Sequence, residues 1–181
     1  AASDVYKRQE DIYDEFVAEL EALASKMTPG SYTSDDETVF QPLSSRSAAE
    51  RLAGQLEDVK KAGGNIRVGG ELSDKGAYIS PAVVTDIPRG SDVYYEEFFG
   101  PIAVVYKVSS DEEALELAND SQFGLGGSVF SQDKERAEKV GSQLEVGMAK
   151  INTHAAEGES IPFGGVKRSG YGRELGPVGM D

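Results

Sequence analysis

The chain has 181 residues, which is enough for one ordinary domain or for a large piece of a bigger one. Acidic residues outnumber basic ones 32 to 18, and the net charge of −14 argues against nucleic acid and anionic membranes as partners, because phosphate binding needs a basic surface. Cysteine is absent, so these residues form no disulfide, no zinc–thiolate site and no thiol nucleophile. No apolar stretch is long enough to span a bilayer, and we expect a soluble, cytoplasmic protein.

The first nine residues stand apart from the rest of the chain. They have no hydrophobic periodicity, and the DNA sequence GCAGCGTCAGATGTGTATAAGAGACAG, which resembles a transposase-type sequencing-library adapter, encodes them in full. We therefore expect residues 1–9 to be an adapter artefact and residues 10–181 to be part of a protein that is truncated at both ends. The alternative is a native strand that ends at Gln9.

A first helix is predicted from Glu10 onward, because apolar residues recur three or four positions apart. The turn at Thr28–Gly30 ends this helix, and a polar surface loop is expected over residues 31–42. The apolar stripe consists of Ile12, Phe16, Leu20, Leu23 and Met27.

A second helix is predicted from the capping-box pattern at Ser47–Glu50, and Gly63 closes it. Two short segments rich in β-branched residues follow, separated by glycine-containing turns. We expect strands over residues 65–68 and 78–85.

The remainder of the chain continues to alternate. Residues 102–106 are nearly all apolar and predict a buried strand, and Ser110–Glu113 caps a third helix. A strand over 127–130, a fourth helix over 133–144 and a strand over 147–152 are expected next. This alternation of strands and helices predicts an α/β fold with a mostly parallel sheet and flanking helices. No linker divides the chain into two domains.

Three segments carry more information than periodicity does. They are Tyr95–Pro101, Leu144–Asn152 and Pro162–Leu175. Taken alone, each has an ordinary structural explanation. Glu96 and Glu97 can be solvated acids at the start of a strand, and the glycines of the last segment can be turn residues.

Together, and in this order, the three segments resemble the C-terminal half of the NAD(P)-dependent aldehyde dehydrogenase superfamily. The patterns Glu-Glu-x-Phe-Gly-Pro and Pro-Phe-Gly-Gly-x-Lys-x-Ser-Gly-x-Gly-Arg-Glu are highly specific to that family, and the resemblance covers residues 10–181. It implies the catalytic-domain half of the aldehyde dehydrogenase fold. In that family a cysteine thiolate attacks the aldehyde, hydride passes to the nicotinamide, and water activated by a glutamate hydrolyses the thioester.

The resemblance places the cysteine and the general-base glutamate upstream of this chain, so no catalytic residue is expected here. The chain alone is then inactive, and the full-length protein is an oxidoreductase that forms homodimers or homotetramers. The alternative is a non-catalytic binding module with the same fold. The acid excess fits either a high-salt cytoplasm or an ordinary acidic surface.

The same resemblance assigns two residues to the cofactor, NAD or NADP. Glu97 matches the family residue that binds the hydroxyls of the nicotinamide ribose, a task for which a carboxylate is suited because it can accept two hydrogen bonds from a vicinal diol. Phe99 matches the aromatic residue beside that ribose, where it restricts the position of the nicotinamide ring. Glu96 is expected to be structural.

Three further residues are assigned to the pocket for a small-molecule aldehyde. Asn152 and His154 lie in the expected loop over the entrance, Phe163 lines its inner wall, and no metal ligands accompany His154. The pattern is closest to the succinate-semialdehyde dehydrogenase branch. However, Glu157 and Glu159 in the loop would repel an anionic substrate unless they point outward, so a neutral or cationic aldehyde is the alternative.

Overall fold

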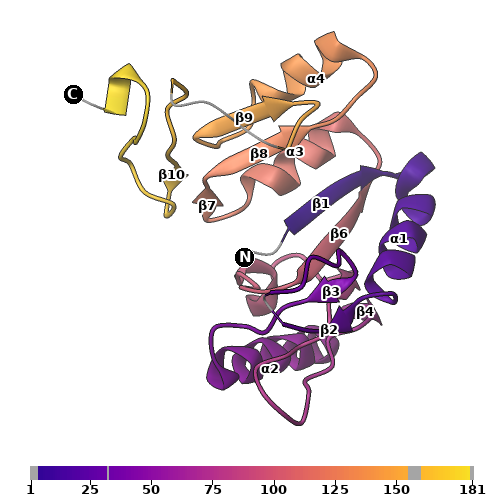
Figure 1. Ribbon diagram of the computed structural model, residues 1–181. Coiled ribbons are helices and arrows are strands. Elements are labelled where there is room, and N and C mark those ends of the chain that lie inside the picture. The colour runs from indigo at the N-terminus through magenta and orange to yellow at the C-terminus, as the bar shows by residue number, and fades with distance from the viewer. Residues whose placement is uncertain (1–3, 32, 155–159, 180–181) are drawn as a thin grey trace. The chain divides into compact units, whose positions relative to one another are not determined.

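The computed structural model describes residues 4–31, 33–154 and 160–179. The chain divides into two compact units, Ala1–Val108 and Ser109–Asp181 (Figure 1). The division falls in the short turn between a strand and the next helix, so no linker composition marks it. Within the described ranges, no helix combines the length and the apolar character that crossing a membrane requires.

The first unit is built on a four-stranded sheet in the order β1-β6-β5-β4. β6 pairs in parallel with both β1 and β5, and β4 is antiparallel to β5. The mixed, mostly parallel sheet and its helices confirm the predicted α/β fold. The bounds are β1 (Asp4–Gln9), β4 (Asn65–Val68), β5 (Ala82–Thr85) and β6 (Ile102–Val108).

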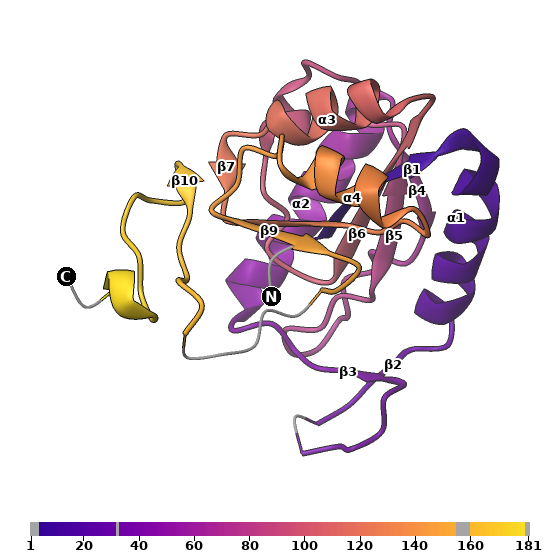
Figure 2. The ribbon, with the colours of Figure 1, turned by 90° about the horizontal axis from the view of Figure 1, so that it is seen from above.

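Two helices, α1 (Glu10–Ala24) and α2 (Arg46–Ala62), cover opposite faces of this sheet (Figure 2). Successive side chains of a strand point to opposite faces, so neighbouring residues of β5 and β6 join different apolar cores. The core beneath α1 contains Tyr13, Val17, Val83 and Val105. The core beneath α2 includes Leu52, Leu56, Val59, Val84 and Val104.

The buried face of α1 differs from the predicted stripe. Ile12 and Leu23 are 52% and 61% exposed, whereas Tyr13 and Val17 are buried. Apolar residues extend over more of the helix surface than one sheet face can cover. Phe16 and Leu20 of the predicted stripe do pack against this core. The pattern therefore located the helix and the middle of its buried face, but it missed Tyr13 and Val17 beside them.

The start of α2 also differs from the prediction, because Ser45 rather than Ser47 is the N-cap. The Ser45 hydroxyl oxygen accepts a hydrogen bond from the Ala48 N–H at 3.1 Å. The predicted end is confirmed, since Gly63 terminates the helix with a φ of 98°, a left-handed conformation that glycine adopts without strain.

Two loop predictions of the first unit need correction. The strand expected over 78–85 begins only at Ala82, because Pro81 has no N–H to contribute to a ladder, and Ile79 forms an isolated bridge with Leu72. The loop expected over 31–42 contains a short strand. This strand, β3 (Val39–Phe40), pairs in parallel with β2 (Thr28–Pro29).

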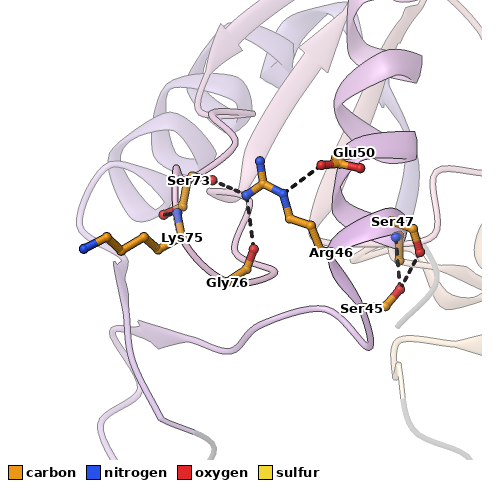
Figure 3. A network of polar contacts seen from close by, with 8 residues as sticks. Ser45, Arg46, Ser47, Glu50, Ser73, Lys75 and Gly76 are labelled. Atoms are coloured by element: carbon orange, nitrogen blue, oxygen red, sulfur yellow. Dashed lines mark hydrogen bonds and ion pairs between the residues drawn. The ribbon is translucent and has the colours of Figure 1, made fainter.

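The long turn between β4 and β5 is attached to the beginning of α2 by Arg46 (Figure 3). The Arg46 guanidinium donates hydrogen bonds to the carbonyl oxygens of Ser73 and Gly76, the latter at 3.1 Å, and to the Glu50 carboxylate at 2.9 Å. One side chain therefore ties the tip of this turn to the first turn of α2.

The second unit begins with α3 and contains two small sheets. β8 and β9 form a parallel pair that packs against α4, and β7 and β10 form an antiparallel pair. The third and fourth helices and the strands expected over 127–130 and 147–152 are present. The fourth helix and the last strand are shorter than predicted, and the strand expected over 127–130 begins and ends one residue earlier. The bounds are α3 (Asp111–Asn119), β7 (Phe123–Gly124), β8 (Gly126–Val129), α4 (Lys134–Gly141), β9 (Met148–Ile151) and β10 (Val166–Lys167).

Residues 4–9, part of the segment expected to be an adapter artefact, form the edge strand β1. Their register runs from Asp4 opposite Ala103 to Gln9 opposite Val108. This is the conformation that the alternative, a native strand, predicts. Lys7 lies opposite Tyr106, and burial lowers the pKa of Lys7 to about 8.

Lys7→Met should stabilise the chain near neutral pH, and the gain should shrink as the pH rises. Between about 8 and 10.5 the unfolded lysine holds a proton that the folded lysine has lost, so the stability of the unsubstituted chain increases with pH in that window. Urea unfolding of the chain on both sides of the window measures this. Lys26→Met, at an exposed position, is the control, and identical pH slopes for all three proteins would contradict the prediction.

Candidate functional site

The first group of candidate residues lies in the loop that leads into β6. Phe98 is buried in the core beneath α2, and Phe99, which follows it, is 53% exposed. Neighbouring side chains in extended backbone point in opposite directions. Phe98 therefore anchors the loop, and this anchor presents the Phe99 ring at the surface.

The two glutamates of this loop have different surroundings. The Gln55 amide of α2 donates a hydrogen bond to the Glu96 carboxylate at 2.7 Å and a longer one to the Glu97 carbonyl oxygen at 3.3 Å. Within the described part of the chain, the exposed Glu97 carboxylate has no hydrogen-bond partner. This geometry agrees with a structural role for Glu96 and leaves the Glu97 oxygens available to a ligand.

The end of the loop is fixed by packing against α2 and β5. The Ala82 N–H donates to the Pro101 carbonyl oxygen at 3.0 Å. A side chain at Gly100 would overlap a methyl group of Leu52, which is itself buried in the core, so the packing there would have to shift. The loop is thus held by both α2 and β5 before the chain enters β6.

The second group of candidate residues belongs to the Pro162–Leu175 segment, which folds back on itself. The backbones of Phe163 and Glu174 exchange two hydrogen bonds, each 2.7 Å long. Arg173 donates to the carbonyl oxygens of Gly165 and Gly172 at 2.7 and 2.9 Å. The Phe163 side chain is 43% exposed and so offers an apolar surface.

Asn152 ends β9 in a left-handed conformation, with a φ of 55°. Its side-chain amide accepts from the Ser131 N–H at 2.8 Å and donates to the Ser131 carbonyl oxygen at 3.0 Å. The side-chain amide thereby takes the place of a backbone amide and extends the β8–β9 hydrogen-bond ladder by one residue pair. Asn152 fixes the point where the following loop leaves the sheet.

His154 is exposed, and its carbonyl oxygen accepts a hydrogen bond from the Lys150 ammonium at 2.9 Å. Glu157 and Glu159 lie outside the described residues. The structure thus brings Glu97 and Phe99 together in one loop of the first unit, and Asn152 and His154 at the end of β9 in the second. Among the described residues, no His, Cys, Asp and Glu side chains gather in a group that could hold a metal ion.

Two residues of the second unit have contacts that the sequence did not predict. Lys167 belongs to one of the motifs that carry the family resemblance, but the resemblance implied no role for it. Asn119 gave no signal beyond its position at the end of a helix. Their side chains connect separate segments of the unit, among them the end of α3 and the end of β10.

The aldehyde dehydrogenase family model matches residues 3–181 of the chain. The chain belongs to the aldehyde dehydrogenase family. The match includes all of β1 and all three of the sequence motifs.

Among the curated relatives, succinate-semialdehyde dehydrogenase [NADP(+)] of Deinococcus radiodurans is 45% identical over 172 residues, which are 94% of this chain and 36% of the relative. Succinate-semialdehyde dehydrogenase [NADP(+)] 1 of Mycobacterium tuberculosis is 39% identical over 171 residues, 94% of this chain and 37% of the relative. The chain therefore spans about a third of the length of the curated relatives it matches.

Aldehyde dehydrogenases are also among the solved structures that match the chain. Succinic semialdehyde dehydrogenase from Streptococcus pyogenes in complex with NADP+ matches with a TM-score of 0.90 and 36% identity, covering 97% of this chain and 39% of that one. Betaine aldehyde dehydrogenase from Staphylococcus aureus in complex with NAD+ matches with a TM-score of 0.91 and 32% identity, covering 98% and 36%.

Gly164→Ala should destabilise the second unit by about 1–3 kcal/mol or more, because the added methyl group would overlap the Gly172 carbonyl oxygen and press on Arg173. Gly172→Ala is the matched control, since nothing lies within 4 Å of the methyl group added there. Urea unfolding of the two variants measures the difference. Equal losses would show that close packing at Gly164 is not what the motif requires.

Proposed function

We propose that this chain is part of an NAD(P)-dependent aldehyde dehydrogenase that oxidises an aldehyde to the carboxylic acid. The observation that carries the proposal is the loop from Glu96 to Pro101. It presents the exposed Glu97 carboxylate beside the exposed ring of Phe99 and is anchored by buried Phe98. Membership of the aldehyde dehydrogenase family supports the same reaction.

The residues of this loop fit the dinucleotide cofactor. Glu97 would accept hydrogen bonds from the hydroxyls of the nicotinamide ribose, and Phe99 would contact the ribose and limit the movement of the ring beyond it. The cofactor supplies the hydride acceptor when bound. NADP is supported by the name of the relative from Deinococcus radiodurans, and NAD by the Staphylococcus aureus structure, which was solved in complex with NAD+.

The residues of the second unit would serve the aldehyde side. Phe163 offers the apolar wall of the entrance, and His154 lies at the start of the loop over it. Asn152 would act by fixing the beginning of this loop, since both ends of its amide are bound to Ser131. Succinate semialdehyde is the proposed substrate, supported by the names of the curated relatives.

The chain contains no cysteine, so the nucleophile of the thioester mechanism would come from a part of the protein outside these 181 residues. We propose that the general-base glutamate does as well, that the chain alone is inactive, and that the whole enzyme is a cytoplasmic homodimer or homotetramer. A non-catalytic module is the second candidate, favoured by the missing thiol. A reading frame that encodes a cysteine shortly upstream would decide for the enzyme.

Glu97→Gln in the complete protein should raise the KM for the cofactor roughly 10- to 100-fold, because a hydrogen bond to a charged group contributes about 1.5–3 kcal/mol. The reduction of NADP+ and NAD+ at saturating aldehyde measures this. Glu96→Gln is the matched control, since Glu96 contacts Gln55 within the protein, and it should change the cofactor KM little. Equal effects of the two substitutions would remove the proposed role of Glu97.

The complete enzyme should have a higher kcat/KM for succinate semialdehyde than for a simple uncharged aliphatic aldehyde. A site that binds the distal carboxylate gains a charge-assisted hydrogen bond, which is worth roughly tenfold or more. Initial rates with both aldehydes at varied concentration make the comparison. Equal or lower efficiency with succinate semialdehyde would favour the neutral or cationic substrate instead.

A further inference from the structure

Lys167 has a set of contacts that the proposed cofactor and aldehyde sites do not use. Its ammonium group lies 2.6 Å from the Asn119 carbonyl oxygen, 3.1 Å from the Ser121 carbonyl oxygen and 2.7 Å from the Glu145 carboxylate. A lysine ammonium has three N–H donors, so each donor has an acceptor. The side chain is 25% exposed, which limits the water that could take the place of these oxygens.

One of these acceptors, the Asn119 carbonyl oxygen, belongs to the last residue of α3, and the Ser121 carbonyl oxygen lies just beyond the helix. The last carbonyl groups of a helix lack intrahelical partners and carry partial negative charge, and a cation there satisfies both conditions. The Lys167 ammonium thus caps α3 from a strand that lies 48 residues further along the chain.

Asn119 extends the same set of contacts to the turn before β9. Its side-chain amide donates to the Gln143 carbonyl oxygen at 2.9 Å, and its side-chain oxygen accepts from the Glu145 N–H at 2.9 Å. Three segments therefore meet in what we name the Asn119–Lys167 cluster. Its members are Asn119, Ser121, Gln143, Glu145 and Lys167.

The backbone of Lys167 is held in a disfavoured conformation. Its φ of 55° lies in the left-handed region, where glycine has no steric penalty and a lysine does. The adjacent segment contains several glycines, so a glycine at this position would fit the local composition. A side chain that persists under backbone strain indicates that the side chain itself is needed.

We propose that Lys167 is a positioning residue for the aldehyde side of the site. Its ammonium fixes β10 against the end of α3 and so sets the position of Phe163, four residues earlier. β10 is only two residues long, and its pairing with β7 gives the segment little stability of its own. The part of this proposal that concerns substrate rests on the proposed function of Phe163.

The test compares Lys167→Met, Lys167→Gly and Lys167→Arg in the complete protein, with Lys139→Met on the exposed side of α4 as the control. Lys167→Met and Lys167→Gly should both raise the aldehyde KM about tenfold and leave the cofactor KM within about twofold, since each loses three charge-assisted hydrogen bonds. Lys167→Gly removes the ammonium group and also relieves the backbone strain. Comparing its KM with that of Lys167→Met therefore separates the effect of the lost charge from the effect of the backbone conformation. Lys167→Arg, which keeps the charge, should recover part of the loss. If Lys167→Met does not fold, Lys167→Gly carries the comparison.

A wild-type aldehyde KM in Lys167→Gly would overturn the proposal, because only the backbone conformation would then matter. A lower melting temperature with unchanged KM in Lys167→Met would overturn it too, as a purely structural role. If the unsubstituted complete protein oxidises no aldehyde, the proposed function fails, and amide hydrogen exchange at Phe163 and Glu174 decides the positioning role. Faster exchange at these two amides in Lys167→Met than in Lys139→Met supports the positioning role, and equal exchange in the two variants refutes it.

Discussion

The parallel pairing of β6 on both of its edges is the constraint on which the first unit depends. β6 lies between β1 and β5, and its consecutive residues Val104 and Val105 enter the two cores on opposite faces of the sheet. A shift of one residue in its register would exchange the two sets of side chains, so the burial of both cores fixes the register. The loop from Glu96 to Pro101 leads directly into this strand, and its position is fixed with that register.

Much of this fold could be predicted from local patterns, because the patterns reflect local physics. Ser110 and Asp133 cap α3 and α4 through hydrogen bonds to the N–H three residues later, as a short polar side chain before a helix predicts. The choice between Ser45 and Ser47 at α2 could not be made in this way. Both serines fit a cap, and Arg46 beside them binds the distant Ser73–Gly76 turn, which the local sequence does not encode.

The candidate site was predictable only in part. The motif resemblance singled out Glu97, Phe99 and Phe163, and the exposed carboxylate and rings are compatible with the roles it implies. The contacts of Lys167 could not be predicted, because two of its partners are backbone carbonyl groups some 46 to 48 residues away. Every residue has such a carbonyl, so no pattern of side-chain types marks the ones that a lysine will reach.

The close approach of Gly100 to Leu52 couples two positions that are far apart in the sequence. There is room for one large side chain between α2 and the loop, and Leu52 occupies it. A larger residue at position 100 would fit only if position 52 became smaller, because a packed interior conserves total volume rather than the identity of each residue. In the evolution of this family the two positions should therefore change together. The shape of the loop that carries Glu97 then depends on a helix residue, Leu52, that no ligand would contact.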